Sequence, residues 1–197
     1  MFEFNTEEAK WFSKPENYTI EKDRVEIITN PNSDFWQRTY YGFRHDNAHV
    51  LYTTTNERYF SFTVKTDFDS STPFDQCGVA IYQNSDNWMK ANIEYLDSSN
   101  SLLGSVVTNC GYSDWATTDI ASNVKTMWYR LSRRESDYCI ENSLDGEEFK
   151  QMRIFHLFEG GAEINFGLMA CSPGNGSFGA VFTDMQVTEC KWEKHDI

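Results

Sequence analysis

The sequence predicts an all-β fold, an antiparallel sandwich or barrel, and three observations support this prediction. Short segments alternate apolar with polar residues and are rich in β-branched and aromatic side chains. Helical periodicity is almost absent, and no helical segments separate the strands as a parallel sheet would require. Asp, Asn, Ser and Gly stand between the segments, as expected for turns.

The predicted strands follow one another along nearly the whole chain. No linker, composition shift or fixed-period repeat divides the sequence, so we expect one domain over residues 1–197. A short N-terminal helical turn is expected near residues 5–12, because Asn5 offers a cap and Pro15 ends the pattern. The expected strands are residues 24–29, 49–52, 59–66, 78–82, 88–95, 105–109, 127–133, 138–143, 149–154, 164–170 and 179–189.

One hairpin turn has a specific sequence signal. Asp145 and Gly146 separate the strand-like segments 138–144 and 147–154. Asp-Gly supplies the positive φ values of a two-residue type I′ turn, whose twist suits antiparallel strands. The sequence therefore predicts a tight hairpin at this position.

Charge excludes two classes of partner. The chain has 17 basic and 30 acidic side chains, a net charge of −13. Nucleic acids and anionic membranes attract clustered Lys and Arg, and no basic run here is longer than Arg133-Arg134. No apolar stretch approaches the roughly 20 residues of a membrane helix. We expect neither a nucleic-acid partner nor a membrane.

The cysteines and the N-terminus favour a cytoplasmic location. Five cysteines stand far apart and are odd in number, which fits free thiols better than a disulfide framework or a zinc site. The N-terminus has no basic segment followed by an apolar one, so no secretory signal is expected.

One strand predicts a polar face that carries an aromatic ring. Residues 88–95 alternate, and the face opposite the core carries Trp88, Lys90, Asn92 and Glu94. The preceding strand places Gln76, Gly78 and Ala80 on its own non-core face. If the two rows adjoin, small residues beside an indole leave room for a sugar. The alternative is a groove filled by a loop.

The composition of the segment 107–115 predicts a loop that takes part in recognition. It holds Tyr112 and Trp115 beside Asn109 and Asp114, on a stretch too polar for a core. The alternative is that both rings fold back and close one end of the sandwich.

Several ordered motifs together resemble one family. The motifs are residues 35–43, 74–79, 88–95, 107–115 and 140–146, and the match runs from about residue 17 to about residue 186. The family that they resemble is the regulation of enolase group. The resemblance implies a concanavalin A-like lectin/glucanase jelly roll of two antiparallel sheets, with the ligand site usually on the concave one. It also implies a cytoplasmic protein that influences enolase and sugar metabolism without a defined reaction.

Enzymatic chemistry has weak support. Glucanases of this fold place paired acids on one strand face, about 5–5.5 Å apart for retention. Glu94 and Asp97 are three residues apart and so point to opposite faces. A pair across strands, Glu94 with Glu141 or Asp75, stays open as a cryptic glycoside hydrolase. We expect Lys90 and Arg130 to keep such acids ionised, which does not suit a general acid.

No metal or cofactor is expected. His45 and His49 are four apart, but on a strand or turn this spacing is only weakly suggestive of zinc.

The sequence therefore predicts a non-catalytic regulatory or binding protein of carbohydrate metabolism, with a concave pocket for a sugar-like ligand. The alternative is a protein-interaction module, whose partner by resemblance is enolase. We expect Trp88, Tyr112 and Trp115 to stack on sugar faces. Hydrogen bonds are expected from Gln76, Lys90, Glu94, Asn109, Asp114, Arg130 and Glu141.

Overall fold

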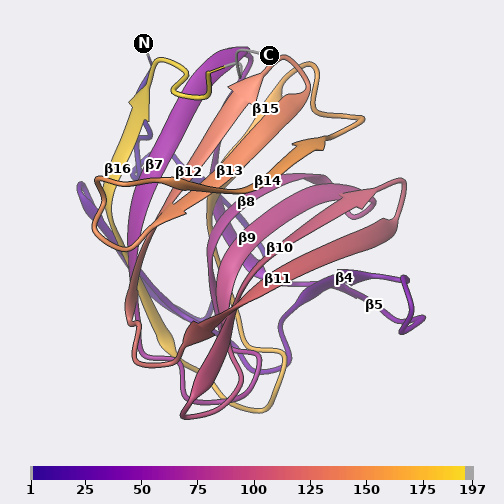
Figure 1. Ribbon diagram of the computed structural model, residues 1–197, viewed down its shortest axis with the longest axis vertical. Coiled ribbons are helices and arrows are strands. Elements are labelled where there is room, and N and C mark those ends of the chain that lie inside the picture. Colours follow the sequence, from indigo (N-terminus) through magenta and orange to yellow (C-terminus); the bar gives the residue numbers. More distant parts are fainter. Residues whose placement is uncertain (1, 194–197) are drawn as a thin grey trace.

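Two large antiparallel sheets form a sandwich in the computed structural model, which describes residues 2–193 (Figure 1). Every strand pairing in this part of the chain is antiparallel, so the predicted fold class is confirmed. In order across sheet A lie β1 (Lys10–Phe12), β6 (His49–Thr55), β15 (Ile164–Cys171), β8 (Gln76–Asn84), β9 (Asn87–Tyr95), β10 (Asn100–Asn109) and β11 (Tyr112–Ala121). Across sheet B lie β14 (Lys150–His156), β13 (Asp137–Ser143), β12 (Thr126–Arg134), β7 (Tyr59–Phe68), β16 (Gly179–Thr188), β3 (Arg24–Ile28) and β2 (Asn17–Glu21).

The main core lies between the two sheets. Alternation places Met89, Ala91 and Ile93 of β9 on this inner face, where they are essentially inaccessible to solvent. Phe62 of β7 and Phe166 of β15 meet edge to face across the sandwich, with ring centroids 5.2 Å apart. Burial of these apolar faces is the main favourable contribution to folding.

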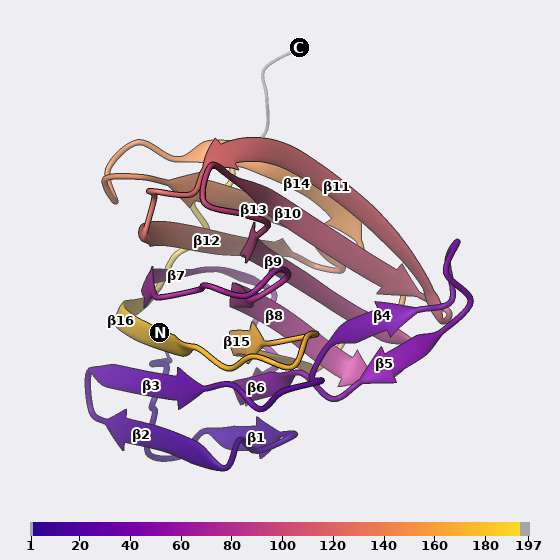
Figure 2. The same ribbon diagram turned by 90° about the horizontal axis from the view of Figure 1, so that it is seen from below.

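A smaller core covers part of the other face of sheet A. Strands β4 (Phe35–Gln37) and β5 (Arg44–Asp46) pair as a hairpin that lies on the side of sheet A away from sheet B (Figures 1 and 2). Phe35 stacks on Trp88 at 5.1 Å and on Tyr82 at 5.4 Å between ring centroids. This second cluster fixes the hairpin over one end of the concave face.

The predicted N-terminal helical turn is wrong. Asn5 does cap a turn over residues 6–8, and its side-chain oxygen accepts a hydrogen bond from the Glu7 backbone N–H at 3.1 Å. The chain then enters β1, where Phe12 stacks on Tyr82 at 3.9 Å. Pairing with β6 supplies the backbone hydrogen bonds that a helix would otherwise make.

The two-residue hairpin turn lies between β10 and β11, not between β13 and β14 as the sequence predicts. Asp145 and Gly146 lie in a six-residue connection between β13 and β14, so the predicted two-residue turn is wrong there. Asp145 Oδ1 instead accepts hydrogen bonds from the backbone N–H groups of residues 147 and 148, an arrangement that stabilises the wider loop. The type I′ turn lies at Cys110 and Gly111, with φ values of 52° and 77°. The predicted loop 107–115 is therefore the tip of the β10–β11 hairpin.

The described chain contains neither a disulfide nor a membrane-spanning helix. All five cysteines are free thiols, and three of them are buried. Within residues 2–193 no helix has the length and apolar character to cross a membrane.

Candidate functional site

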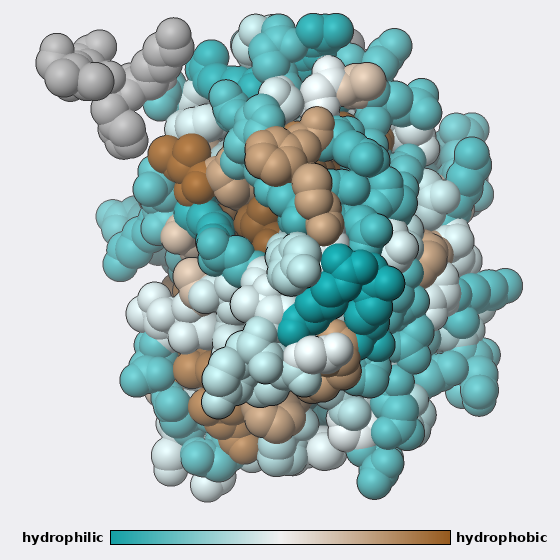
Figure 3. Space-filling model, turned by 90° about the vertical axis from the view of Figure 1, so that its right-hand side faces the viewer, coloured by the Kyte–Doolittle hydropathy of each residue, from teal (hydrophilic) through white to brown (hydrophobic). Residues whose placement is uncertain are grey.

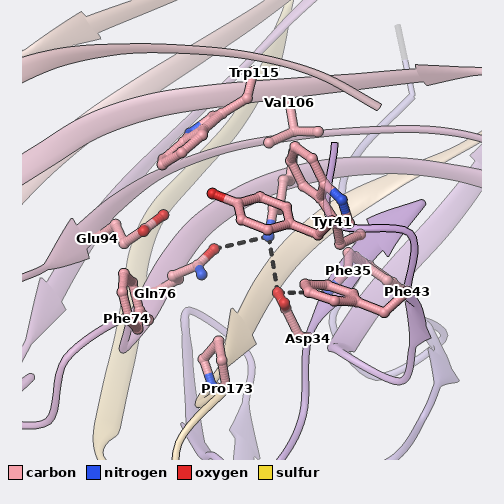
Figure 4. A pocket seen from close by; sticks show the side chains of 12 residues that line it. Asp34, Phe35, Tyr41, Phe43, Phe74, Gln76, Glu94, Val106, Trp115 and Pro173 are labelled. Atoms are coloured by element: carbon pink, nitrogen blue, oxygen red, sulfur yellow. Dashed lines mark hydrogen bonds and ion pairs between the residues drawn. The ribbon is translucent and has the colours of Figure 1, made fainter. Parts of the chain in front are cut away.

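A cavity of about 250 Å³ opens between the concave face of sheet A and the hairpin β4–β5 (Figure 4). The sheet supplies its polar floor, while the hairpin, the segment before β8 and the segment after β15 supply most of its rim. The cavity is lined by Asp34, Phe35, Trp36, Tyr41, Phe43, Phe74, Gln76, Lys90, Glu94, Val106, Trp115 and Pro173.

Lys90 is the centre of a buried hydrogen-bonded group on the floor. Its ammonium Nζ donates to Asp34 Oδ1 at 3.1 Å and to Gln76 Oε1 at 2.9 Å. The residue is only 3% exposed. Burial lowers the pKa of Lys90, but the nearby Asp34 carboxylate and other anionic groups outweigh this, and the net pKa is raised. Lys90 therefore carries its charge and is already neutralised by a partner.

Glu94, on the same strand face, has a different environment. Burial raises the pKa of its carboxyl to about 7, and the nearby Lys90 charge only partly opposes this. The Glu94 side chain makes no hydrogen bond with any residue between 2 and 193. Figure 4 shows its carboxylate oxygens turned toward the middle of the pocket, between Trp115 and Gln76. The expectation that Lys90 keeps this acid fully ionised is wrong.

Aromatic side chains form the rim. Tyr41, Phe43, Phe74 and Trp115 line the pocket and are all substantially exposed. Figure 3 views this side of the molecule and shows pale and brown side chains surrounded by teal, hydrophilic ones. An exposed set of rings on one surface is unusual for a soluble protein and typically marks a contact site.

Asn92 lies between two glycines on the same face of β9. Its register partners are Gly78 on β8 and Gly104 on β10. The side chain is 1% exposed, and neither its amide nitrogen nor its oxygen has a hydrogen-bond partner among the described residues. A Cβ on Gly104 would lie 3.3 Å from Trp115 Nε1, so the indole packs directly on this glycine. The neighbouring backbone covers Gly78 and the Trp115 indole covers Gly104, so both glycines are positions of close approach around Asn92.

Residues 11–190 match the family model described as Protein of unknown function (DUF1349). The chain belongs to this family. Regulation of enolase protein 1 of Saccharomyces cerevisiae is 31% identical over 186 residues, which cover 93% of this chain and 92% of the relative. The resemblance predicted from the motifs is confirmed.

Solved structures extend the comparison of this DUF1349 chain. A functionally unknown protein from Saccharomyces cerevisiae has a TM-score of 0.86 at 29% identity, covering 94% of this chain and 98% of that one. A legume lectin-like domain from Entamoeba histolytica has a TM-score of 0.56 at 10% identity, covering 91% of this chain and 89% of that one. The GH43 protein BlXynB (K247S) from Bacillus licheniformis reaches 0.68 at 14%, covering 89% of this chain and 35% of that one. The last two likenesses show the fold alone, a lectin-like jelly roll as predicted.

The structure brings four of the predicted site residues together at the cavity. Gln76, Lys90 and Glu94 share the concave face, as strand alternation predicts, and Trp115 reaches the same cavity from β11.

Trp88 is not an open stacking platform, and that expectation is wrong. Its side chain is 0% exposed beneath Phe35, and its Nε1 donates to the Ser85 carbonyl oxygen at 3.2 Å. Trp88 lies at the end of β9 that the hairpin β4–β5 covers, whereas Lys90 lies further along the strand. The hairpin therefore packs on Trp88, where an open groove was expected. The alternative of a groove filled by a neighbouring segment applies to this end of the face.

The remaining hairpin residues point away from the cavity. Asn109 bonds to the His156 carbonyl and the Phe158 backbone N–H, which ties the hairpin to the end of β14. Asp114 forms an ion pair with Arg153. Tyr112 is exposed at the tip, with Arg38 over its ring. None of these three side chains lines the cavity, so their predicted role in this pocket is wrong.

Arg130 and Glu141 lie on sheet B, facing away from the sandwich core. The guanidinium holds the carboxylate with two bonds, Nε–Oε2 at 2.6 Å and Nη2–Oε1 at 2.7 Å. Arg130 also stacks on Phe149, 4.1 Å from the ring centroid. Because Glu94 is on the other sheet, the predicted Glu94–Glu141 pair is wrong.

Asp75 and His49 are occupied by structural contacts. Asp75 accepts hydrogen bonds from two backbone N–H groups, at residues 71 and 72, and from Ser172 Oγ at 2.7 Å. His49 Nε2 accepts the Asn30 backbone N–H at 3.0 Å while its Nδ1 donates to the Ser13 carbonyl at 2.5 Å. Among residues 2–193 no three acidic, His or Cys side chains are grouped to hold a metal ion.

Sequence reasoning missed five pocket residues that come from connecting segments. Alternation gives no information about such segments, and contacts distant in sequence bring them to the sheet. One signal was available: residues 35–43 contain five aromatic rings and a glycine, which is a dense aromatic turn. The missed residues are Asp34, Tyr41, Phe43, Phe74 and Pro173.

Proposed function

We propose that the protein is a non-catalytic regulatory binding protein, and that its concave cavity takes a small, sugar-like polyol. The observation that supports this is the pairing of an aromatic rim with a buried polar floor. C–H faces of a sugar ring stack on Trp115 or Phe74, while its hydroxyl groups reach Glu94 and the Gln76 amide. The name of the yeast relative supports a regulatory role, and we extend it to a link with carbohydrate metabolism in the cytoplasm.

The arrangement of charges favours binding over hydrolysis. A glycoside hydrolase needs one acid that gives a proton and a second carboxylate free to attack or to activate water. Glu94 has the raised pKa of a proton donor, but Asp34 is held by Lys90 at 3.1 Å. The same oxygen, Asp34 Oδ1, also accepts the Phe35 backbone N–H at 2.7 Å, so the protein itself holds this carboxylate in place beside Lys90.

A second candidate function is protein binding, with enolase as the partner. Two observations favour it: the name of the yeast relative and the exposed rings at the cavity mouth. A pull-down of purified enolase by the wild-type protein and by Tyr41→Ala discriminates the two functions. Capture that is lost in Tyr41→Ala supports the protein partner, and absence of any complex removes it.

Tryptophan fluorescence titration tests the sugar proposal. Neutral mono- and oligosaccharides are added to the wild-type protein, to Trp115→Ala, and to Trp128→Ala, whose indole lies on sheet B beside Lys65. We expect a saturable signal in the wild type and in Trp128→Ala, and its loss in Trp115→Ala. A flat response of the wild type to every sugar, with unchanged thermal stability, would overturn the proposal.

A further inference from the structure

We propose that the ligand of the cavity is a polyol ring that bears a free ammonium group, an amino sugar, and that Glu94 receives this ammonium. The inference rests on the proposed function and names the class of ligand. It follows from three features of the cavity: a buried carboxyl without a partner, a lysine that is already neutralised, and a rim of aromatic rings.

The Glu94 carboxyl is the first feature. A buried carboxyl normally accepts hydrogen bonds from the protein, since desolvation without compensation costs several kcal/mol. Glu94 is 6% exposed and finds no such donor among residues 2–193. It nevertheless lines the cavity and points into it (Figure 4), so a ligand can supply the missing donor. An ammonium supplies both a donor and a compensating charge.

The charge balance of the floor is the second feature. Lys90 is the one Lys or Arg among the described residues that line the cavity, and its charge is compensated by its bonds to Asp34 and Gln76. None of these lining residues therefore offers an uncompensated cation to a phosphate or carboxylate. Once Glu94 is ionised, Asp34, Glu94 and Lys90 together carry one net negative charge. The chain as a whole carries −13, which also attracts cations and repels anions. A phosphorylated sugar is therefore disfavoured, and a cationic one is favoured.

The rim is the third feature. Tyr41, Phe43, Phe74 and Trp115 present ring faces or edges around the mouth. Aromatic faces attract cations and also stack on the C–H faces of a sugar ring, so the same rim suits both parts of an amino sugar. A volume of about 250 Å³ is slightly below the roughly 300–1,000 Å³ of most small-molecule sites, and it fits a single ring rather than a long chain.

Binding should also depend on pH. The titratable groups that face Glu94 are Lys90 on its own strand, Asp34 before β4 and the buried Cys171 thiol on β15. The pKa of Glu94 is about 7, whereas the pKa values of Lys90 and Cys171 are raised above their ordinary ranges. Affinity therefore rises as Glu94 ionises around pH 7, and it falls again when the ligand amine loses its proton.

Isothermal titration calorimetry at pH 7 tests the inference. Glucosamine, glucose, N-acetylglucosamine and glucose 6-phosphate are each titrated into the wild type, Glu94→Gln and the control Glu141→Gln. We expect the wild type and the control to bind glucosamine roughly tenfold tighter than glucose or N-acetylglucosamine, and glucose 6-phosphate most weakly. Glu94→Gln should bind glucosamine and glucose equally.

The outcomes separate this inference from the proposed function. Equal binding of glucosamine and glucose by the wild type overturns the ammonium site but leaves the sugar pocket. A glucosamine preference that survives in Glu94→Gln also overturns it. No binding of any of the four sugars overturns both proposals. Circular dichroism of Glu94→Gln confirms that a lost preference does not come from misfolding.

Discussion

Two acid–base groups, one on each sheet, look alike in the sequence and differ in the structure. On the outer face of sheet B, Arg130 and Glu141 satisfy each other with two short bonds and are covered by Phe149. On the concave face of sheet A, Lys90 bonds to Asp34, and the Glu94 side chain on the same strand has no hydrogen-bond partner among residues 2–193. In the first group each charged side chain is paired with the other. In the second group the Glu94 carboxyl can still accept a hydrogen bond from a ligand.

The difference teaches that both a binding site and a structural pair can carry charge. What distinguishes them is whether their buried charged groups already have hydrogen-bond partners within the protein. A bidentate Arg–carboxylate pair holds its own geometry and offers no free donor or acceptor. A buried carboxyl with a raised pKa stores an unfavourable interaction that a ligand can relieve. The two sheets therefore predict opposite responses to the same kind of substitution.

The largest expected effect separates the two tryptophan positions. Trp88→Ala removes an indole that is 0% exposed beneath the hairpin β4–β5, and it should lower the free energy of unfolding by about 3–5 kcal/mol. Trp128→Ala, on the half-buried outer face of sheet B, should cost about 1 kcal/mol. Urea unfolding measures both. Equal losses would show that the hairpin does not cover the concave face as described.

The next effect compares the two glutamates. The pKa of Glu94 is about 7 in the folded protein and 4.5 ordinarily, so its stabilising contribution is complete below pH 4.5 and is lost as the pH rises through 7. Glu94→Gln should therefore be more stable than the wild type at pH 8, by up to about 3 kcal/mol, and nearly equal to it at pH 4. Glu141→Gln should instead be less stable at pH 8, by about 1 kcal/mol, because it breaks the pair with Arg130.

Urea unfolding at the two pH values decides the sign of each effect. Destabilisation of both variants at pH 8 would mean that Glu94 has a protein donor and is structural like Glu141. Stabilisation of both would contradict the account of the pair on sheet B.

The smallest expected effect concerns His49 at the start of β6 in sheet A. Burial lowers the pKa of its imidazole, with the bond to the Ser13 carbonyl partly opposing this. The neutral ring also accepts the Asn30 N–H. Its stabilising contribution is complete above the ordinary pKa of 6.5 and is lost as the pH falls through the lowered value. Between pH 7.5 and 5, the urea midpoint of the wild type should fall more than that of His49→Gln. Identical slopes would mean that protonation does not break this contact.

Strand alternation predicted much of the fold and part of the site. It placed Gln76, Lys90 and Glu94 on one face, because side chains alternate with a period of two wherever a strand forms. It could not assign Arg130 and Glu141 to the other sheet, since alternation says nothing about which sheet a strand joins.

Exposure was the harder property to predict. Trp88 occurs in a polar row and is nevertheless buried, because a hairpin more than 40 residues away in sequence lies over it. Strands of three residues, such as β4 and β5, have too few positions to show a period. The tip of the β10–β11 hairpin was read as a loop because β11 is a largely exposed edge strand with few apolar positions.

The central claim is that Glu94 is a buried carboxyl with a raised pKa and that it binds the ammonium group of a ligand. A ¹³C NMR titration of its side-chain carboxyl group, assigned with Glu94→Gln, tests this directly in the free protein and with glucosamine. The account predicts a midpoint near pH 7 in the free protein and a clearly lower midpoint with the ligand, since a bound ammonium favours the charged carboxylate. A free midpoint near the ordinary 4.5, unchanged by glucosamine, would contradict it.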